Sequence, residues 1–246
     1  MLRKRPQAQN FARTIRTRSD SGSFQRYVKS LFIDGCETTS EDASLVLSTC
    51  TGVERLVLRS LGRKYDFSMT NLRYLTLAGN AVDAQYYLHN LPPTLTHLAL
   101  DSNMFSWFPL SGILDLWEDV FARCPALTHV CWAVLSYPAD FDLISAIVSI
   151  LPPTLEMLAI QIWAVHDEEQ ARSLGQDLKG IDGRVVFVSY DLEGRPGIPI
   201  DGVGLRHFDT KDGWGYLWRE REDEYIWRFA QEAVEKRRGE ISYPKF

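Results

Sequence analysis

Two histidines and a cysteine are the residues of this chain whose types and spacing suggest chemistry. His97 and His129 each follow a threonine, in Thr96-His97 and Thr128-His129, and Cys131 lies two residues after His129. Two imidazole nitrogens and a thiolate are typical zinc ligands, and a zinc-bound water is the reactive group of many hydrolases. A metal-binding protein or hydrolase that uses these residues is therefore one hypothesis, although the sequence offers no obvious fourth ligand.

Catalysis finds no further support in the sequence. The chain contains no glycine-rich phosphate loop, no HExxH segment and no GxSxG segment. The run His166-Asp167-Glu168-Glu169 is more typical of a helix start than of an acid–base pair, because acidic residues are favourable near a helix N-terminus. We therefore predict a protein that is not an enzyme and holds no cofactor or metal, with the metal site or hydrolase as the alternative.

The elements that would position these residues follow a repeat. Residues 72–80 and 95–103 both have the pattern LxxLxLxxN, the strand and turn of a leucine-rich repeat. Leucines that alternate along a short strand point to one side, towards a core. Asn80 and Asn103, three residues after the last leucine, carry an amide that can satisfy buried backbone groups of the turn.

When any apolar residue is accepted at the leucine positions, the repeat extends over most of the chain. Starts are then predicted at residues 28, 53, 72, 95, 127, 155 and 185, and the last copy (Val185, Val188, Tyr190) is degraded. Leu-Pro-Pro-Thr-Leu leads into two of these strands, at 91–95 and 151–155, and Cys50 and Cys124 stand three residues before two others. A proline pair ends one element and directs the next, while a small thiol tolerates burial.

This pattern predicts an α/β fold, a leucine-rich-repeat solenoid of six to seven repeats with a curved parallel sheet inside and helices outside. Helices are expected between the strands, at residues 39–47, 81–88, 112–122, 140–150 and 167–178. Thr39 and Ser40 can cap the first of them. A charged, aromatic helix at 216–236 is predicted to cap the last strand.

Three segments are expected along the chain. The solenoid occupies residues 27–190, and residues 191–246 hold an irregular segment and the capping helix. Residues 1–26 contain seven Lys or Arg and a single acid, Asp20. We interpret them as a basic linker or docking helix at the open end of the solenoid. A mitochondrial presequence, which is also Arg-rich and acid-poor, and a nuclear-import or anion-binding patch remain alternatives.

A binding surface is predicted on the side of the strands that faces away from the core. Side chains between the repeat leucines line the concave face, which is the usual binding surface of solenoids. Arg and Tyr are typical energetic anchors of protein interfaces. The candidate binding residues are Phe32, Arg55, Arg59, Tyr74, His97, Asp101, His129 and Met157. Smaller residues expected on the same face include Val57, Thr76 and Ala99.

Composition and charge restrict the compartment and the partners. The chain has 246 residues, of which 45% are hydrophobic and 24% charged, and its formal net charge is -5. This mild acidity gives no reason to expect nucleic acid, and no stretch has the roughly 18 to 20 apolar residues of a membrane span. Four cysteines are too few for a disulfide framework, and no signal-peptide h-region precedes them. We expect a cytoplasmic or nuclear protein whose partner is a protein, with no nucleic acid and no membrane.

The residues also resemble a known family. The segment 124–130 (Cys-Pro-Ala-Leu-Thr-His-Val), the two Leu-Pro-Pro-Thr-Leu units and the acidic–aromatic helix at 218–238 are similar to the leucine-rich-repeat region of fungal F-box/LRR-type proteins. The resemblance covers residues 26–190 and extends to the tail in part. It implies a substrate receptor of a cullin-type ubiquitin ligase, in which an F-box docks the ligase adaptor. Within this chain no Leu-Pro-x-Glu F-box motif precedes Val28, so the resemblance implies the substrate-binding part alone, with ubiquitin-ligase components as candidate partners.

Overall fold

A computed structural model of the chain describes residues 5–18, 22–35, 38–59, 69–78, 86–100, 110–134, 141–163, 182–190, 227–228, 230–235 and 238–239. Two compact units divide the chain, residues 1–127 and residues 128–246. The segment boundaries predicted at residues 26 and 190 remain predictions. No helix among the described residues is both long enough and apolar enough to span a bilayer.

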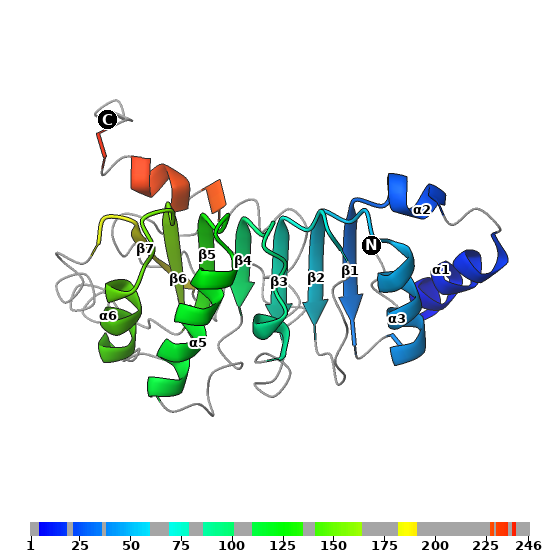
Figure 1. Cartoon of the computed structure of the whole chain (residues 1–246), viewed down its shortest axis with the longest axis horizontal. Helices are drawn as coiled ribbons and strands as arrows, with labels where there is room; N and C mark the ends of the chain where they lie inside the picture. Colours follow the sequence, from blue (N-terminus) through cyan, green and yellow to red (C-terminus); the bar gives the residue numbers. More distant parts are fainter. Residues whose placement is uncertain are drawn as a thin grey trace. The chain divides into compact units, whose positions relative to one another are not determined.

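Among its described residues, the first unit contains four parallel strands, which are formed by the first four repeats (Figure 1). They are β1 (Ser30–Asp34), β2 (Arg55–Arg59), β3 (Tyr74–Ala78) and β4 (His97–Leu100), paired in sequence order. The repeat leucines lie in register in two rows: Leu31, Leu56, Leu75 and Leu98, then Ile33, Leu58, Leu77 and Leu100. All eight side chains are buried. The repeat starts predicted at 28, 53, 72 and 95 are therefore confirmed.

Backbone hydrogen bonds repeat with the sequence in this unit. One carbonyl before each strand accepts two N–H groups from the next repeat, at 2.9 to 3.0 Å. The acceptors are Lys29, Glu54 and Arg73, and the donor pairs are residues 54–55, 73–74 and 96–97. Because the same residue position is anchored in each copy, the side chains that follow it are held at one level across the sheet.

The turns before the strands also repeat. The first residue of the repeat donates to the carbonyl three residues earlier, at 2.9 to 3.3 Å, in the pairs Val53–Cys50, Leu95–Pro92, Leu127–Cys124 and Leu155–Pro152. Cys50 and Cys124 therefore occupy the place that proline takes in the Leu-Pro-Pro-Thr-Leu units. Both thiols are buried, as the sequence predicted.

The basic N-terminal segment is helical and packs on the first repeat. α1 (Arg5–Thr17) lies against α3 (Ser40–Thr49), and its Arg16 Nη2 bonds the carboxylate of buried Asp42 at 2.9 Å. α2 (Gly22–Tyr27) buries Phe24, whose ring meets that of Phe11 on α1 edge-on at 5.8 Å. The hydroxyl of Thr39 accepts from the Asp42 N–H and caps α3, which confirms the predicted cap.

Helices also occur where the spacing of apolar residues predicted them after β3 and β4. α5 (Leu110–Arg123) matches the helix predicted at 112–122 and buries Ile113, Leu116, Trp117 and Val120. Residues 86–89 are helical and form the described end of the helix predicted at 81–88. Both belong to the first unit.

The second unit holds β5 (His129–Val134), β6 (Met157–Trp163) and β7 (Val185–Tyr190), paired in parallel, and α6 (Phe141–Ser149) (Figure 1). Val130 pairs with Leu158 and Trp132 with Ile160, as the repeat starts at 127 and 155 predict. The register predicted for the seventh copy is wrong. Leu158 pairs with Val185 and Ile160 with Phe187, so the copy begins three residues earlier, at residue 182.

The physical reason for this shift is an acid in the first leucine position. Asp182 occupies it, and its carboxylate accepts hydrogen bonds from the Arg184 N–H and the Arg184 guanidinium. The same guanidinium donates to the carbonyls of Pro152 and Leu155, at 2.8 and 3.2 Å. Hydrogen bonds of Asp182 and Arg184 therefore replace the apolar contact that the first leucine would make between the last two repeats.

Some predictions concern residues outside the described ranges. They include Asn80, Asn103, Asp101 and the helix at 167–178. In the C-terminal segment, residues 227–228 and 230–235 are helical, within the helix predicted at 216–236. The predicted curvature of the sheet and the cap over its last strand remain predictions.

Candidate functional site

Three of the predicted binding residues form one row across the first unit. Arg55, Tyr74 and His97 are the first residues of β2, β3 and β4, and they lie in register. Each is half-buried, and each N–H is anchored to the preceding repeat by the hydrogen bonds described above. We call these three residues the aromatic row.

The side chains of the aromatic row stack on one another. The Arg55 guanidinium carbon lies 4.9 Å from the centre of the Tyr74 ring, within the range of a cation–π interaction. The Tyr74 and His97 rings have their centres 4.2 Å apart, with 31° between their planes. Neighbouring strands are about 4.8 Å apart, so the register by itself brings planar side chains to stacking distance.

Thr96 fixes the orientation of the His97 ring. Its hydroxyl donates to the Arg73 carbonyl at 3.0 Å and lies 2.9 Å from His97 Nδ1. A hydroxyl has one proton, and a carbonyl can only accept. The Thr96 oxygen therefore accepts from His97 Nδ1–H, which assigns the tautomer of the neutral ring.

The next row of the same face is less exposed than the sequence suggested. Phe32 is half-buried, but Val57, Thr76 and Ala99, which follow it in register, are buried with 4%, 6% and 6% of their surface exposed. These three lie on the predicted face, in register with Phe32, but they are not exposed there. Short side chains on a sheet lie below the tips of longer neighbours, so a place on this face does not by itself make them exposed.

Arg59 lies at the opposite end of β2 and is engaged within the sheet. Its Nη1 lies 3.7 Å from the carboxylate of Asp34, its register partner on β1, and both side chains are half-buried. Arg59 is therefore paired with Asp34 and does not belong to the aromatic row.

The two predicted binding residues of the second unit, His129 and Met157, are both covered by other parts of the chain. His129 and Met157 are in register at the starts of β5 and β6, but Met157 has no exposed surface. The prediction that Met157 contributes to a surface is therefore wrong. The Trp227 ring lies edge-on to His129, with the ring centres 5.9 Å apart, so the C-terminal segment covers the histidine. These residues are far apart in the sequence, and no local pattern predicted the contact.

Burial lowers the pKa of His129 below its ordinary value of 6.5, while Gln231 and the charge of Glu156 act in the opposite direction. Thr128 Oγ1 lies 2.7 Å from His129 Nδ1, the same relation as between Thr96 and His97. Gln231 Nε2 donates to Glu235 Oε1 at 2.9 Å, and its Oε1 is buried with no hydrogen-bond partner among the described residues.

The described residues give no support to the metal or hydrolase hypothesis. Among them, no three His, Cys, Asp or Glu side chains are placed to hold a metal ion. His97 belongs to the first unit, whereas His129 and Cys131 belong to the second. Cys131 is buried, with 3% of its surface exposed.

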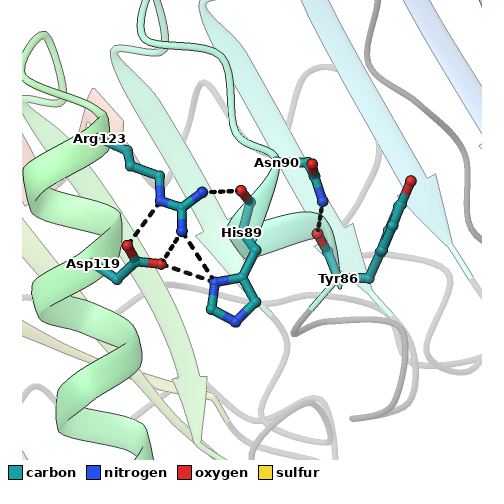
Figure 2. A network of polar contacts seen from close by, with 5 residues as sticks. All are labelled: Tyr86, His89, Asn90, Asp119 and Arg123. Carbon is teal, nitrogen blue, oxygen red and sulfur yellow. Dashed lines mark hydrogen bonds and ion pairs between the residues drawn. The ribbon is translucent and has the colours of Figure 1, made fainter.

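Sequence reasoning missed a polar cluster in the first unit (Figure 2). Asp119 and Arg123 on α5 form a bidentate pair, with Nε to Oδ1 at 2.8 Å and Nη2 to Oδ2 at 2.5 Å. His89 Nδ1 lies 2.8 Å from Asp119 Oδ2, and Arg123 Nη1 donates to the His89 carbonyl. Beside them, Asn90 Nδ2 donates to the Tyr86 carbonyl at 2.7 Å. The Asp119–Arg123 pair, four residues apart on a helix, could have been found in the sequence, whereas the contacts of both residues with His89 could not.

The electrostatics of this cluster are those of a structural contact. Hydrogen bonds from Arg123, and then from His89, hold the pKa of Asp119 below its usual range although partial desolvation opposes them. An Asp–His pair also occurs in catalytic triads. Here Arg123 occupies both carboxylate oxygens and also bonds the backbone of residue 89, so the cluster fastens α5 to the segment 86–90.

Comparison with known proteins adds little to this description. No family model and no curated protein matches the sequence. The chain is similar to a solved structure, the leucine-rich repeat-containing protein LegL7 from Legionella pneumophila, with 11% identity over 92% of this chain and 79% of that chain and a TM-score of 0.43. A TM-score of this size carries no argument. The repeated register and turns of the chain itself show an α/β arrangement of parallel strands and helices, of the kind that the leucine-rich-repeat pattern of its sequence predicts.

Proposed function

We propose that this chain is a non-enzymatic protein-recognition module that binds a protein partner through the aromatic row, with Phe32 at its side. The observation that carries the proposal is the stack of Arg55, Tyr74 and His97, held in register on three strands and half-buried. Tyr and Arg are among the side chains that dominate the energy of protein interfaces.

The stack suits recognition because it is ordered before a partner arrives. Immobilising a flexible side chain at an interface costs about 0.5–1.5 kcal/mol. Three side chains already fixed by register and stacking spare most of that cost. The Arg55–Tyr74 interaction would also strengthen from about 0.5–1 kcal/mol when exposed to about 2 kcal/mol when a partner removes water from it.

The resemblance to fungal F-box/LRR proteins supplies a class of partner for this proposal. On that reading, the chain acts in the cytoplasm or nucleus as a substrate-binding part related to ubiquitin-ligase receptors, and ligase components are candidate partners. This finer assignment is a hypothesis that the experiment below addresses directly.

Affinity capture from native extract tests the proposal. Wild-type chain, Arg55→Ala and Tyr74→Ala would be compared, with the captured proteins scored for ligase-adaptor components. We expect each substitution to weaken capture of the partner at least about tenfold, which corresponds to about 1.4 kcal/mol.

Arg73→Ala is the matched control, because Arg73 is an exposed arginine directly before Tyr74 and lies outside the aromatic row. It should leave capture unchanged, and thermal denaturation should show that all variants fold. If Arg55→Ala and Tyr74→Ala capture the same proteins as wild type, the aromatic row is not the contact surface. If a partner is captured without any ligase component, the recognition role stands and the ligase assignment falls.

A further inference from the structure

His129 in the second unit occupies the same position on its strand as His97 does in the first unit, and the structure shows what covers His129. His129 begins β5 as His97 begins β4, and in each case a threonine hydroxyl lies within 2.9 Å of Nδ1. The two rings are therefore held on their strands in the same way. Residue types and local geometry agree, so one occupied position is informative about the other.

The occupant of the His129 position is a helical segment of this chain. Trp227 presents its ring edge-on to His129 at 5.9 Å and 86°, and Gln231, four residues later, lies at the same imidazole. Residues four apart lie on one face of a helix. Ala230 and Val234 are buried with 0% and 1% of their surface exposed, so the segment is packed in place.

We infer that the aromatic row binds an amphipathic helix of the partner protein, one that presents an aromatic residue and, four residues later, a side-chain amide. This inference rests on the proposed function and deepens it by naming the chemistry of the partner. The partner's ring would meet His97 and Tyr74 as Trp227 meets His129. Aromatic pairs favour such edge-to-face contact.

The charge of Arg55 adds a second requirement. We expect the partner helix to carry an acidic side chain one turn before its aromatic residue, where it would pair with Arg55. The C-terminal segment of this chain has such a composition, since Asp223 and Glu224 stand four and three residues before Trp227 in the sequence. The expected ligand is therefore an acidic–aromatic helix rather than a basic one.

A labelled peptide tests this directly, because the chain supplies the sequence of a suitable probe. A fluorescein-labelled peptide of residues 222–238 (EDEYIWRFAQEAVEKRR) would be titrated with the full chain and followed by anisotropy. We expect saturable binding that falls at least tenfold in His97→Ala and in Tyr74→Ala, and that is lost when the peptide carries Ala in place of Trp227. Arg73→Ala should bind like wild type.

A second variant keeps the test decisive if His97→Ala folds poorly. His97→Asn retains a donor for Thr96 but removes the outer part of the ring, so it should fold and still bind at least tenfold more weakly. Absence of binding to wild type up to 500 μM peptide, or binding that is indifferent to both His97 substitutions, would overturn the inference. Native partner capture that depends on Arg55 and Tyr74 would leave the proposed function standing in that case.

Discussion

Gly52→Ala should displace α2 from the first repeat. A Cβ built on Gly52 would lie 1.7 Å from the carbonyl oxygen and 2.8 Å from the carbonyl carbon of Gln25, on α2. Both atoms belong to backbone, so no side chain can rotate away. Since contacts under 3.0 Å are not tolerated, α2 and the turn that carries Gly52 must separate by at least 1.3 Å, the difference between 3.0 and 1.7 Å.

The loss of stability in Gly52→Ala can be estimated from two alternative responses of α2. A local shift of α2 resembles overpacking of a core, which costs about 1–3 kcal/mol. Complete release of α2 would expose Phe24 and cost about 1.5–3 kcal/mol for that side chain alone. The chain will take the cheaper route, so we expect the free energy of unfolding of the first unit to fall by about 1–3 kcal/mol.

The equivalent turn positions explain why the effect is specific. Thr94, Ala126 and Thr154 stand third in their turns, as Gly52 does, and each carries a Cβ. Thr94 even donates to the Leu72 carbonyl of the preceding repeat. Only in the first described turn does a helix carbonyl take the space of the side chain.

Urea denaturation and hydrogen exchange of residues 11–27 would measure the change. Gly183→Ala is the matched control, because a Cβ there meets nothing within 4 Å and its backbone is not left-handed. It should be neutral, or stabilising by about 0.4–1 kcal/mol through the unfolded chain. Equal stability of the two variants, with unchanged exchange in residues 11–27, would refute the reasoning.

Three further predictions follow from burial. Leu75→Ala should lower the free energy of unfolding by about 2–5 kcal/mol, because it empties a fully buried position in the leucine row; a loss below about 1 kcal/mol in urea denaturation would contradict it. Burial raises the pKa of Cys50 and of Cys124 to about 11, so iodoacetamide at pH 8 should label both only after denaturant is added, and rapid labelling of the native chain would contradict this. Burial lowers the pKa of His129, so the released state gains its proton first as the pH falls below 6.5, and attachment of the C-terminal segment should be complete above that pH and weaken below it. Trp227 fluorescence should report this release, and His129→Asn should remove the pH dependence.

The regular part of the fold was predictable because its signal is local. Apolar residues at fixed spacing define a strand, and a repeat of that spacing defines which strands are equivalent, so the register of Leu31, Leu56, Leu75 and Leu98 follows from the sequence. The register of the seventh copy was predicted wrongly because Asp182 interrupts the apolar pattern and pairs with Arg184 instead. An apolar search then finds Val185 first and places Phe187 on the wrong face.

Contacts between distant segments could not be predicted in this way. His89 meets Asp119 and Arg123, Trp227 meets His129, and the Gln25 carbonyl meets Gly52, and each pair requires knowledge of where two elements lie. The candidate site could be predicted only in part. The repeat placed Arg55, Tyr74 and His97 in one row, but only the structure shows that they stack and that Met157 is buried.

The outward faces of the two units differ in composition, and this difference argues for where a partner binds. In the second unit, the strand starts hold His129 and Met157: Met157 is fully buried and the Trp227 ring lies against His129, so other parts of the chain cover these places. In the first unit, the corresponding places at the strand starts hold Arg55, Tyr74 and His97, which keep exposed surface. A face of apolar residues is stable only when covered by the chain itself, whereas a stacked row of polar and aromatic side chains can remain in water until a partner arrives. Replacing Tyr74 and His97 by leucine should therefore make the first unit prone to self-association, not more stable, and sedimentation of that double variant as a monomer would count against this assignment.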